Sequence, residues 1–147
     1  MRRSPSDDAR FVGVCLCVWL LAAVVGARQS APTEEEYGAL MTEIRFTVGD
    51  AELHVDARYW PELGEDLDKL MPMFRQVEAF WTARGTDDAV GFAKETIAAF
   101  TELSAAAIDQ NRGGALAAIM ALRATCESCH EKHREQTDDG YRIKPGS

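Results

Sequence analysis

Two cysteines and a histidine close to the C-terminal end are the residues whose types and spacing could do chemistry. They lie in the sequence Cys126-Glu127-Ser128-Cys129-His130, and Cys-x-x-Cys-His is the spacing of c-type haem attachment. Two thiols three residues apart on a helix project from one face, so both can add to the vinyl groups of one haem. The next imidazole then lies under the iron, which a proximal histidine commonly holds. The motif predicts one covalently attached haem c, with thioethers at Cys126 and Cys129 and with His130 as the proximal iron ligand.

Zinc and a disulfide are the alternatives for the same residues. The two cysteines together with His130 and His133 would supply four zinc ligands from one short segment. One helix, however, cannot wrap four ligands tetrahedrally around an ion. A thioredoxin-like dithiol requires a strand-to-helix context, which this segment lacks. Haem attachment is therefore the favoured interpretation, while a non-haem helical protein with a Cys126–Cys129 disulfide or bound zinc stays open.

The first 27 residues have the composition of a secretory signal peptide. Arg2, Arg3 and Arg10 precede an uncharged, largely apolar run over residues 11–27, which ends in small residues. We expect cleavage after Ala27 and export to the periplasm. The alternative is an uncleaved membrane anchor, although the run is at the short limit for crossing a bilayer. Two of the four cysteines would leave with the signal peptide, and the remaining pair would enter an oxidising compartment.

Composition and charge exclude several classes of function. The 147 residues suffice for one domain, and 46% hydrophobic with 27% charged residues is the mix of a packed globular protein. The formal net charge is -8, and an acidic chain lacks the positive surface that binds phosphate backbones. We therefore expect no nucleic-acid partner. The sequence contains no pattern of a nucleophile with its base or of paired catalytic carboxylates, so we do not expect an enzyme.

The elements that must position the motif are helices. Apolar residues recur in steps of three and four, the period of amphipathic helices that share a core. These stripes run over residues 37–55, 63–81, 90–107 and 115–133. Thr33 followed by Glu36 predicts a capping box at the first helix, and the short connections force antiparallel neighbours. The sequence predicts an all-α fold, an antiparallel up-down-up-down four-helix bundle over residues 28–137, with a frayed tail over 138–147.

A four-helix bundle with one Cys-x-x-Cys-His near its C-terminus, followed by an arginine, resembles the cytochrome c′ family, the class II c-type cytochromes. The resemblance covers residues 33–134. Leu40-Met41 lies where the low-spin branch of that family carries its axial methionine, so the resemblance implies Met41 as the sixth iron ligand. It also implies that Arg134 contacts a haem propionate or the proximal side. The sequence departs from the family at His133, where an aromatic residue is usual.

Bundle topology brings the two expected iron ligands to one end of the molecule. In an up-down bundle the C-terminal end of the fourth helix lies beside the N-terminal end of the first. His130 and Met41 can therefore face each other across a haem in the core. We expect the aromatic residues Phe80, Trp81 and Phe92 at the same end. The alternative for Met41 is that it only fills the core, as methionine does well.

These residues imply an electron-transfer protein. With His130 and Met41 both bound, the iron has no open position for a substrate and can only cycle between Fe(III) and Fe(II). If Met41 only packs, the resemblance implies instead a five-coordinate centre that binds nitric oxide or carbon monoxide. The acidic surface favours redox partner proteins with basic docking surfaces. Haem-attachment machinery is an expected partner during maturation, and homodimers are common in the family that the chain resembles.

Overall fold

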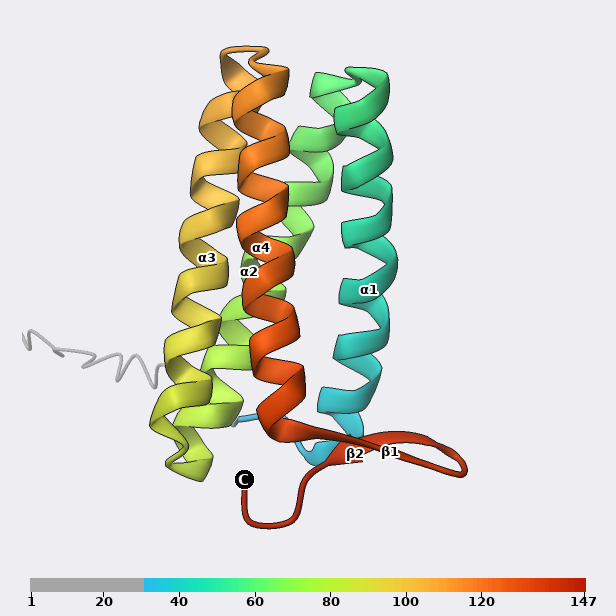
Figure 1. The fold of residues 1–147 in the computed structure, drawn as a ribbon, viewed down its shortest axis with the longest axis vertical. Helices are drawn as coiled ribbons and strands as arrows, with labels where there is room; N and C mark the ends of the chain where they lie inside the picture. The colour runs from blue at the N-terminus through green and yellow to red at the C-terminus, as the bar shows by residue number, and fades with distance from the viewer. Residues whose placement is uncertain (1–30) are drawn as a thin grey trace, which may run out of the picture.

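Four long helices followed by a short β-hairpin make up the structure, a computed structural model that describes residues 31–147 (Figure 1). The elements are α1 (Glu34–Ala57), α2 (Trp60–Arg84), α3 (Asp87–Ile108), α4 (Arg112–His133), β1 (Arg134–Thr137) and β2 (Gly140–Ile143). The helices run antiparallel to their neighbours and pack against one another, which confirms the predicted all-α four-helix bundle. None of the helices within residues 31–147 has the length and apolar content needed to span a bilayer. The predicted signal peptide, residues 1–27, lies outside the described residues.

Local signals in the sequence set the ends of the helices. The hydroxyl oxygen of Thr33 accepts a hydrogen bond from the backbone N–H of Glu36 at 3.2 Å. The Glu36 carboxylate in turn accepts one from the backbone N–H of Thr33 at 2.7 Å, and this bond lowers the pKa of Glu36. The predicted capping box is therefore present. The second helix ends at Gly85, whose φ of 73° is a left-handed conformation that glycine adopts without steric cost.

The core lies along the axis of the bundle, where the four predicted apolar stripes meet. Its largest fully buried side chains include Trp81, Phe100, Leu63, Leu70, Leu103 and Leu122. The α4 helix contributes fewer buried residues than the others, and in its second half only His133 is fully buried beyond Leu122. Cys126, Cys129 and His130 are half-buried on this helix, so the motif lies at the edge of the core.

The boundary between α1 and α4 is the weakest in the bundle. The other three pairs of neighbouring helices make much more extensive contacts along their length. Two ion pairs cross this boundary towards the end where α1 stops. The guanidinium of Arg123 donates to the Glu52 carboxylate at 2.6 Å, and that of Arg112 donates to the Asp56 carboxylate at 2.9 Å. Charged pairs thus bridge the boundary, and Arg123 lies one helical turn before Cys126 of the motif.

The C-terminal segment forms a hairpin, so the expectation that residues 138–147 fray is wrong for the part that forms β2. Strands β1 and β2 pair antiparallel with Arg134 opposite Ile143. Ile143 packs against the edge of the core, and the guanidinium of Arg134 lies 4.2 Å from the centre of the Tyr141 ring. Figure 1 shows the hairpin passing beneath the beginning of α1. Apolar burial and the stacked arginine supply the stabilisation that a frayed tail would lack.

The sequence carried a signal for this hairpin that the helical interpretation overlooked. The turn consists of Asp138 and Asp139, a residue type common in tight turns, and Gly140 follows at the start of β2 with a φ of 135°, which side chains rarely allow. The backbone N–H of Lys144 also donates to the carbonyl oxygen of His133 at 2.9 Å. This bond ties the end of the hairpin back to the end of α4.

Candidate haem-attachment site

The two thiols of the motif are free and half-buried near the end of α4. Burial raises the pKa of Cys126, and it raises the pKa of Cys129 to about 11. Both thiols are therefore protonated at neutral pH. Reactive dithiols of redox enzymes instead have depressed pKa values that supply the thiolate. The surroundings of the pair thus give no support to a thioredoxin-like dithiol, whereas half-buried neutral thiols pose no obstacle to bonding to an apolar cofactor.

The His130 imidazole is neutral in this environment. Burial is the main cause that lowers its pKa to about 4, and the positive charge of Arg134 lowers it further. A histidine must be neutral to give its lone pair to a metal. His130 is thus in the protonation state that iron ligation requires over the whole physiological pH range.

Met41 lies at the same end of the molecule as the motif. It is half-buried and packs against the edge of the core, as does Cys126. Met41 is the eighth residue of α1, and Cys126 is the eighth from the end of α4. At 1.5 Å per residue both lie about 10 Å from that end of the bundle. Since α1 begins where α4 finishes (Figure 1), the structure places Met41 and the motif at one level on adjacent helices.

An aromatic cluster surrounds this end of the core. Tyr37, one turn before Met41 on α1, stacks on Phe80 with ring centroids 4.1 Å apart. Its hydroxyl oxygen accepts a hydrogen bond from the indole N–H of Trp81 at 2.9 Å. Burial is the main cause that raises the pKa of Tyr37, and the charges of the motif's cysteines would raise it further, because they are close to it. Phe80 and Trp81 are therefore at the expected end, and Tyr37 is a site neighbour that sequence reasoning treated only as a core residue.

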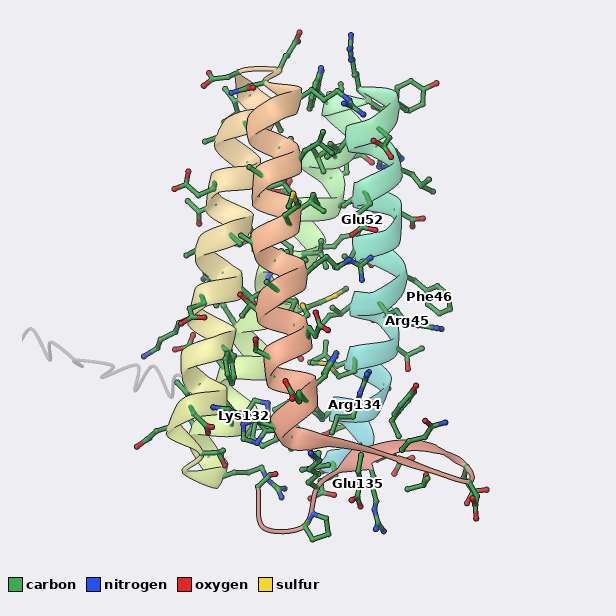
Figure 2. The ribbon with its side chains drawn as sticks, viewed as in Figure 1. Arg45, Phe46, Glu52, Lys132, Arg134 and Glu135 are labelled. Atoms are coloured by element: carbon green, nitrogen blue, oxygen red, sulfur yellow. The ribbon has the colours of Figure 1, made fainter. Side chains whose placement is uncertain are left out.

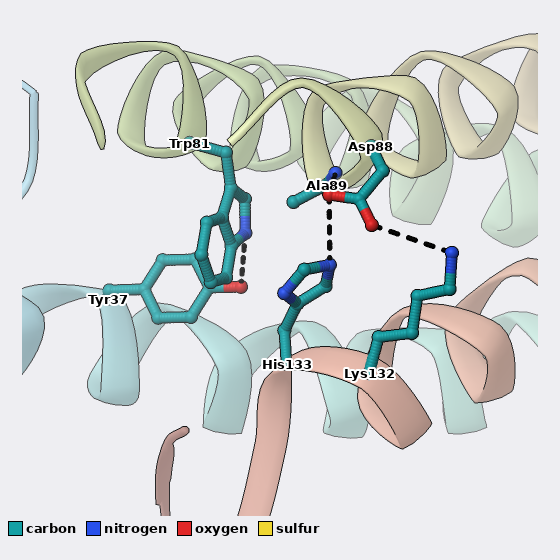
Figure 3. A network of polar contacts seen from close by, with 6 residues as sticks. All are labelled: Tyr37, Trp81, Asp88, Ala89, Lys132 and His133. Carbon is teal, nitrogen blue, oxygen red and sulfur yellow. Dashed lines mark hydrogen bonds and ion pairs between the residues drawn. The ribbon is translucent and has the colours of Figure 1, made fainter. Parts of the chain in front are cut away.

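His133, the last residue of α4, packs against side chains of α2 and α3. Its ring lies 5.1 Å from that of Trp81 and 6.4 Å from that of Phe92. Its Nε2 is 3.4 Å from a carboxylate oxygen of Asp88 (Figure 3), yet neither ring nitrogen has a well-aligned hydrogen bond within residues 31–147. His133 thus occupies the buried position that the resemblance gives to an aromatic residue. The sequence indicated this burial, because His133 belongs to the apolar stripe over residues 115–133.

Arg134, which the resemblance assigns to a haem propionate or the proximal side, lies over an aromatic ring, and so does Arg45. Arg134 is exposed at the start of β1 and stacks on Tyr141, but its charge still acts on His130. Arg134 is therefore close to the candidate site. Arg45 lies over the ring of Phe46, with its guanidinium carbon 4.6 Å from the ring centre. The two side chains lie together on α1 in Figure 2.

Zinc fits the site less well than haem does. Within residues 31–147 no group of three or more His, Cys, Asp or Glu side chains is placed to hold a metal ion. The zinc alternative needs four protein ligands, and the His133 ring packs against Trp81 and Phe92. A haem brings four nitrogen ligands of its own, so the protein must supply only one or two. The donor set of two thiols, a neutral imidazole and a thioether fits a haem c.

No protein-family model matches this chain, and neither a curated protein nor a solved structure matches it. The likeness to the cytochrome c′ family therefore rests on the motif, on Leu40-Met41 and on the bundle topology.

Proposed function

We propose that the protein is a monohaem c-type cytochrome that transfers electrons in the periplasm. The observation that carries the proposal is the state of His130. It is a neutral, half-buried imidazole directly after two free, half-buried thiols, on the helix end that adjoins the start of α1. When bound, haem c supplies the Fe(III)/Fe(II) couple.

Each residue of the site has a separate task in this proposal. Cys126 and Cys129 hold the cofactor through thioethers, so that it is not lost to other haem-binding proteins. His130 would hold the iron as the proximal ligand and Met41 as the sixth, and a methionine would raise the reduction potential compared with a second histidine. The buried ring of Tyr37 and the indole of Trp81 exclude water from the same end of the core. If His130 and Met41 both bound the iron, no position would be open to a substrate, and the haem would supply electron transfer.

The export signal and the charge of the chain suggest where this happens and with which partners. Covalent attachment requires dedicated machinery, which an exported chain would meet before or during folding. The net charge of -8 favours redox partners with basic docking surfaces, because opposite charges speed encounter. Residues 1–27 are proposed to be removed after Ala27.

The test is to produce the protein in a host that attaches haem c, and to measure its mass and its colour after denaturation. A covalent adduct of one haem that stays with the chain in acidified organic solvent supports the proposal. The variant with Cys126→Ser and Cys129→Ser should release its pigment or have none. Ser128→Ala, between the two cysteines, is the matched control and should keep the adduct. A colourless protein without a mass addition would leave the disulfide or zinc alternative.

Gas binding is the second candidate function, and the packing of Met41 against the core favours it. A methionine that only fills space would leave the iron five-coordinate and open to nitric oxide or carbon monoxide. The ferric optical spectrum distinguishes the two functions. A low-spin spectrum with a methionine–sulfur charge-transfer band supports electron transfer, whereas a high-spin spectrum supports gas binding. Met41→Ala should convert the first spectrum into the second, and an unchanged spin state would refute ligation by Met41.

A further inference from the structure

His133 is a buried ionisable residue that the proposed electron transfer does not use. Only 8% of its surface is exposed, and neither ring nitrogen has a well-aligned hydrogen bond within residues 31–147. A buried polar group without a partner costs free energy. The ring packs between Trp81 and Phe92, where a phenylalanine would offer a similar shape without polar atoms. An imidazole at this position therefore points to a chemical task.

One carboxylate faces the buried ring. Nε2 of His133 lies 3.4 Å from Oδ1 of Asp88, in the first turn of α3 (Figure 3). Desolvation is the largest influence on the pKa of Asp88 and acts to raise it, yet the charge of His133 and the hydrogen bond from Lys132 bring that pKa below its ordinary value. Burial disfavours a charged imidazole, whereas a nearby carboxylate favours it. Because these influences oppose each other, a further charge nearby can decide whether the ring is protonated.

Asp88 also connects the buried ring with solvent. Its side chain is 49% exposed, whereas both nitrogens of His133 are shielded from water. A carboxylate that reaches both water and an imidazole can pass a proton between them. The two residues thus have the arrangement of a buried proton acceptor and its relay.

The other ionisable groups around the ring come from each element packed near it. Lys132 and Arg84 are both paired with carboxylates, and the Tyr37 hydroxyl accepts a hydrogen bond from Trp81. Among the residues that the structure describes, Asp88 alone forms an ion pair with His133. The groups are Lys132 of α4, Arg84 of α2 with its partner Glu34, Tyr37 of α1, Arg134 at the start of β1 and Lys144 after β2.

The His133–Asp88 pair is electrostatically linked to the Cys-x-x-Cys-His motif. Burial is the main cause that raises the pKa of Cys129 to about 11, the charge of Cys126 is the second, and the Asp88 carboxylate is a further one. His133 follows Cys129 by four residues, about 6 Å along α4. At an effective dielectric constant of about 20, a unit charge roughly 10 Å away changes a protonation equilibrium about tenfold. A change of charge at a cofactor held by the motif would therefore act on the pair.

We propose that His133 takes up a proton when the haem iron is reduced, with Asp88 as its relay to solvent, so that electron transfer is coupled to proton transfer. This inference rests on the proposed function. One electron from a reduced partner protein converts Fe(III) to Fe(II), and one proton passes from water through Asp88 to Nε2 of His133. Reoxidation returns the electron to an acceptor and the proton to water. The positive charge on the ring offsets the added electron, so reduction is easier at low pH.

The first experiment measures the reduction potential of the haem-loaded full chain from about pH 5 to about pH 8, where histidine titrates. Over this range the potential should fall further in the wild type than in His133→Phe, by about 59 mV, the equivalent of tenfold coupling to one electron. Asp88→Asn should move the fall to lower pH, because the protonated ring loses its carboxylate. His54→Phe is the matched control, since it replaces the imidazole that bonds to Asp66 at the other end of the bundle, and it should behave as the wild type.

The second experiment follows the imidazole signals of His133 by nuclear magnetic resonance and does not depend on the phenylalanine variant folding. In the haem-loaded wild type these signals should titrate at a pH about one unit higher after reduction than before. In the apoprotein they should titrate at lower pH in Asp88→Asn than in the wild type. Mass spectrometry checks haem attachment in every variant, and circular dichroism checks the helices.

The outcomes separate this inference from the proposed function. A haem protein whose potential depends on pH equally in the wild type and in His133→Phe overturns the role of His133 and leaves electron transfer intact. The same holds if the His133 signals do not move on reduction. If Asp88→Asn matches the wild type in both experiments, Asp88 is not the relay. A chain that attaches no haem overturns the proposed function, and the coupling falls with it.

Discussion

His54 and His130 lie at opposite ends of the bundle and show how one residue type serves two purposes. Both imidazoles are half-buried. His54 Nδ1 lies 2.7 Å from a carboxylate oxygen of Asp66, a residue that is only 4% exposed. For His130, burial and a nearby arginine are the influences on its pKa, and no carboxylate contributes. The His54 imidazole thus bonds to a carboxylate and links α1 to α2, whereas the His130 imidazole keeps a lone pair available. Burial alone does not distinguish a structural histidine from a metal ligand. The difference is whether a carboxylate bonds to the imidazole.

The largest expected effect is that of His130→Ala on the haem-loaded protein. Removing the proximal ligand should abolish the low-spin spectrum entirely, because the iron loses a protein bond that no neighbour replaces. Optical spectroscopy of the purified variant measures this. His54→Ala is the matched control at the other end of the bundle and should leave the spectrum unchanged. Equal spectral effects of the two substitutions would contradict the distinction between the ends.

The second prediction concerns the stability of the fold, where His54 rather than His130 should have the larger effect. His54→Ala should lower the free energy of unfolding by about 1–3 kcal/mol, since Asp66 would keep a buried carboxylate with one partner fewer. Chemical denaturation gives the value. Lys69, whose Nζ is 3.6 Å from the other Asp66 oxygen, limits the loss. In the double variant with Asp66→Ala the two losses should be less than additive, and full additivity would show that the two side chains do not interact.

A third, smaller effect is expected from Tyr37→Phe at the motif end. This change keeps the aromatic ring but removes the hydroxyl that accepts a hydrogen bond from the indole N–H of Trp81. The buried N–H then loses its partner, which should cost about 1 kcal/mol of unfolding free energy. Thermal or chemical unfolding measures the loss. Trp81→Phe should cost more, because it leaves a cavity in the core besides breaking the hydrogen bond.

The smallest expected effect is a pH dependence of the chain before haem is attached. The folded pKa of His130 is about 4, below its ordinary value of 6.5. Between these two pH values the unfolded chain therefore binds more protons than the folded one. His130 should make the apoprotein less stable as the pH falls from 6.5 towards 4. Unfolding curves at several pH values should show a slope that is reduced in His130→Ala. An identical slope would mean that the imidazole is not held neutral.

Much of the proposed site follows from local spacing in the sequence. Cys126, Cys129 and His130 lie within two turns of one helix, so helical geometry alone gives them neighbouring directions. The 4-3 pattern of apolar residues likewise predicted which face of each helix is buried. Met41 was harder, because its place beside the motif follows from the antiparallel topology. That topology could be inferred only because the connections are short.

Other features were missed because they depend on contacts between distant residues. The hydrogen bond of His54 with Asp66 forms only when the short connection between α1 and α2 folds them against each other. His133 follows His130 by one helical turn, and its ring packs against Trp81 and Phe92 from two other helices. The hairpin was missed because two four-residue strands carry too little periodicity to be recognised. Strand pairing and the burial of Ile143 stabilise it, and neither is visible in a short polar sequence.

The sequence by itself determined the helices, their buried faces and the spacing of the residues proposed to attach a haem, because each of these follows from spacing along one chain segment. The tertiary structure decided which imidazole is left neutral and unpaired by acids and which one is bound to a carboxylate. Those outcomes depend on desolvation and on side chains brought together from different helices. The spacing of residues along the chain predicts neither the desolvation nor these contacts between helices.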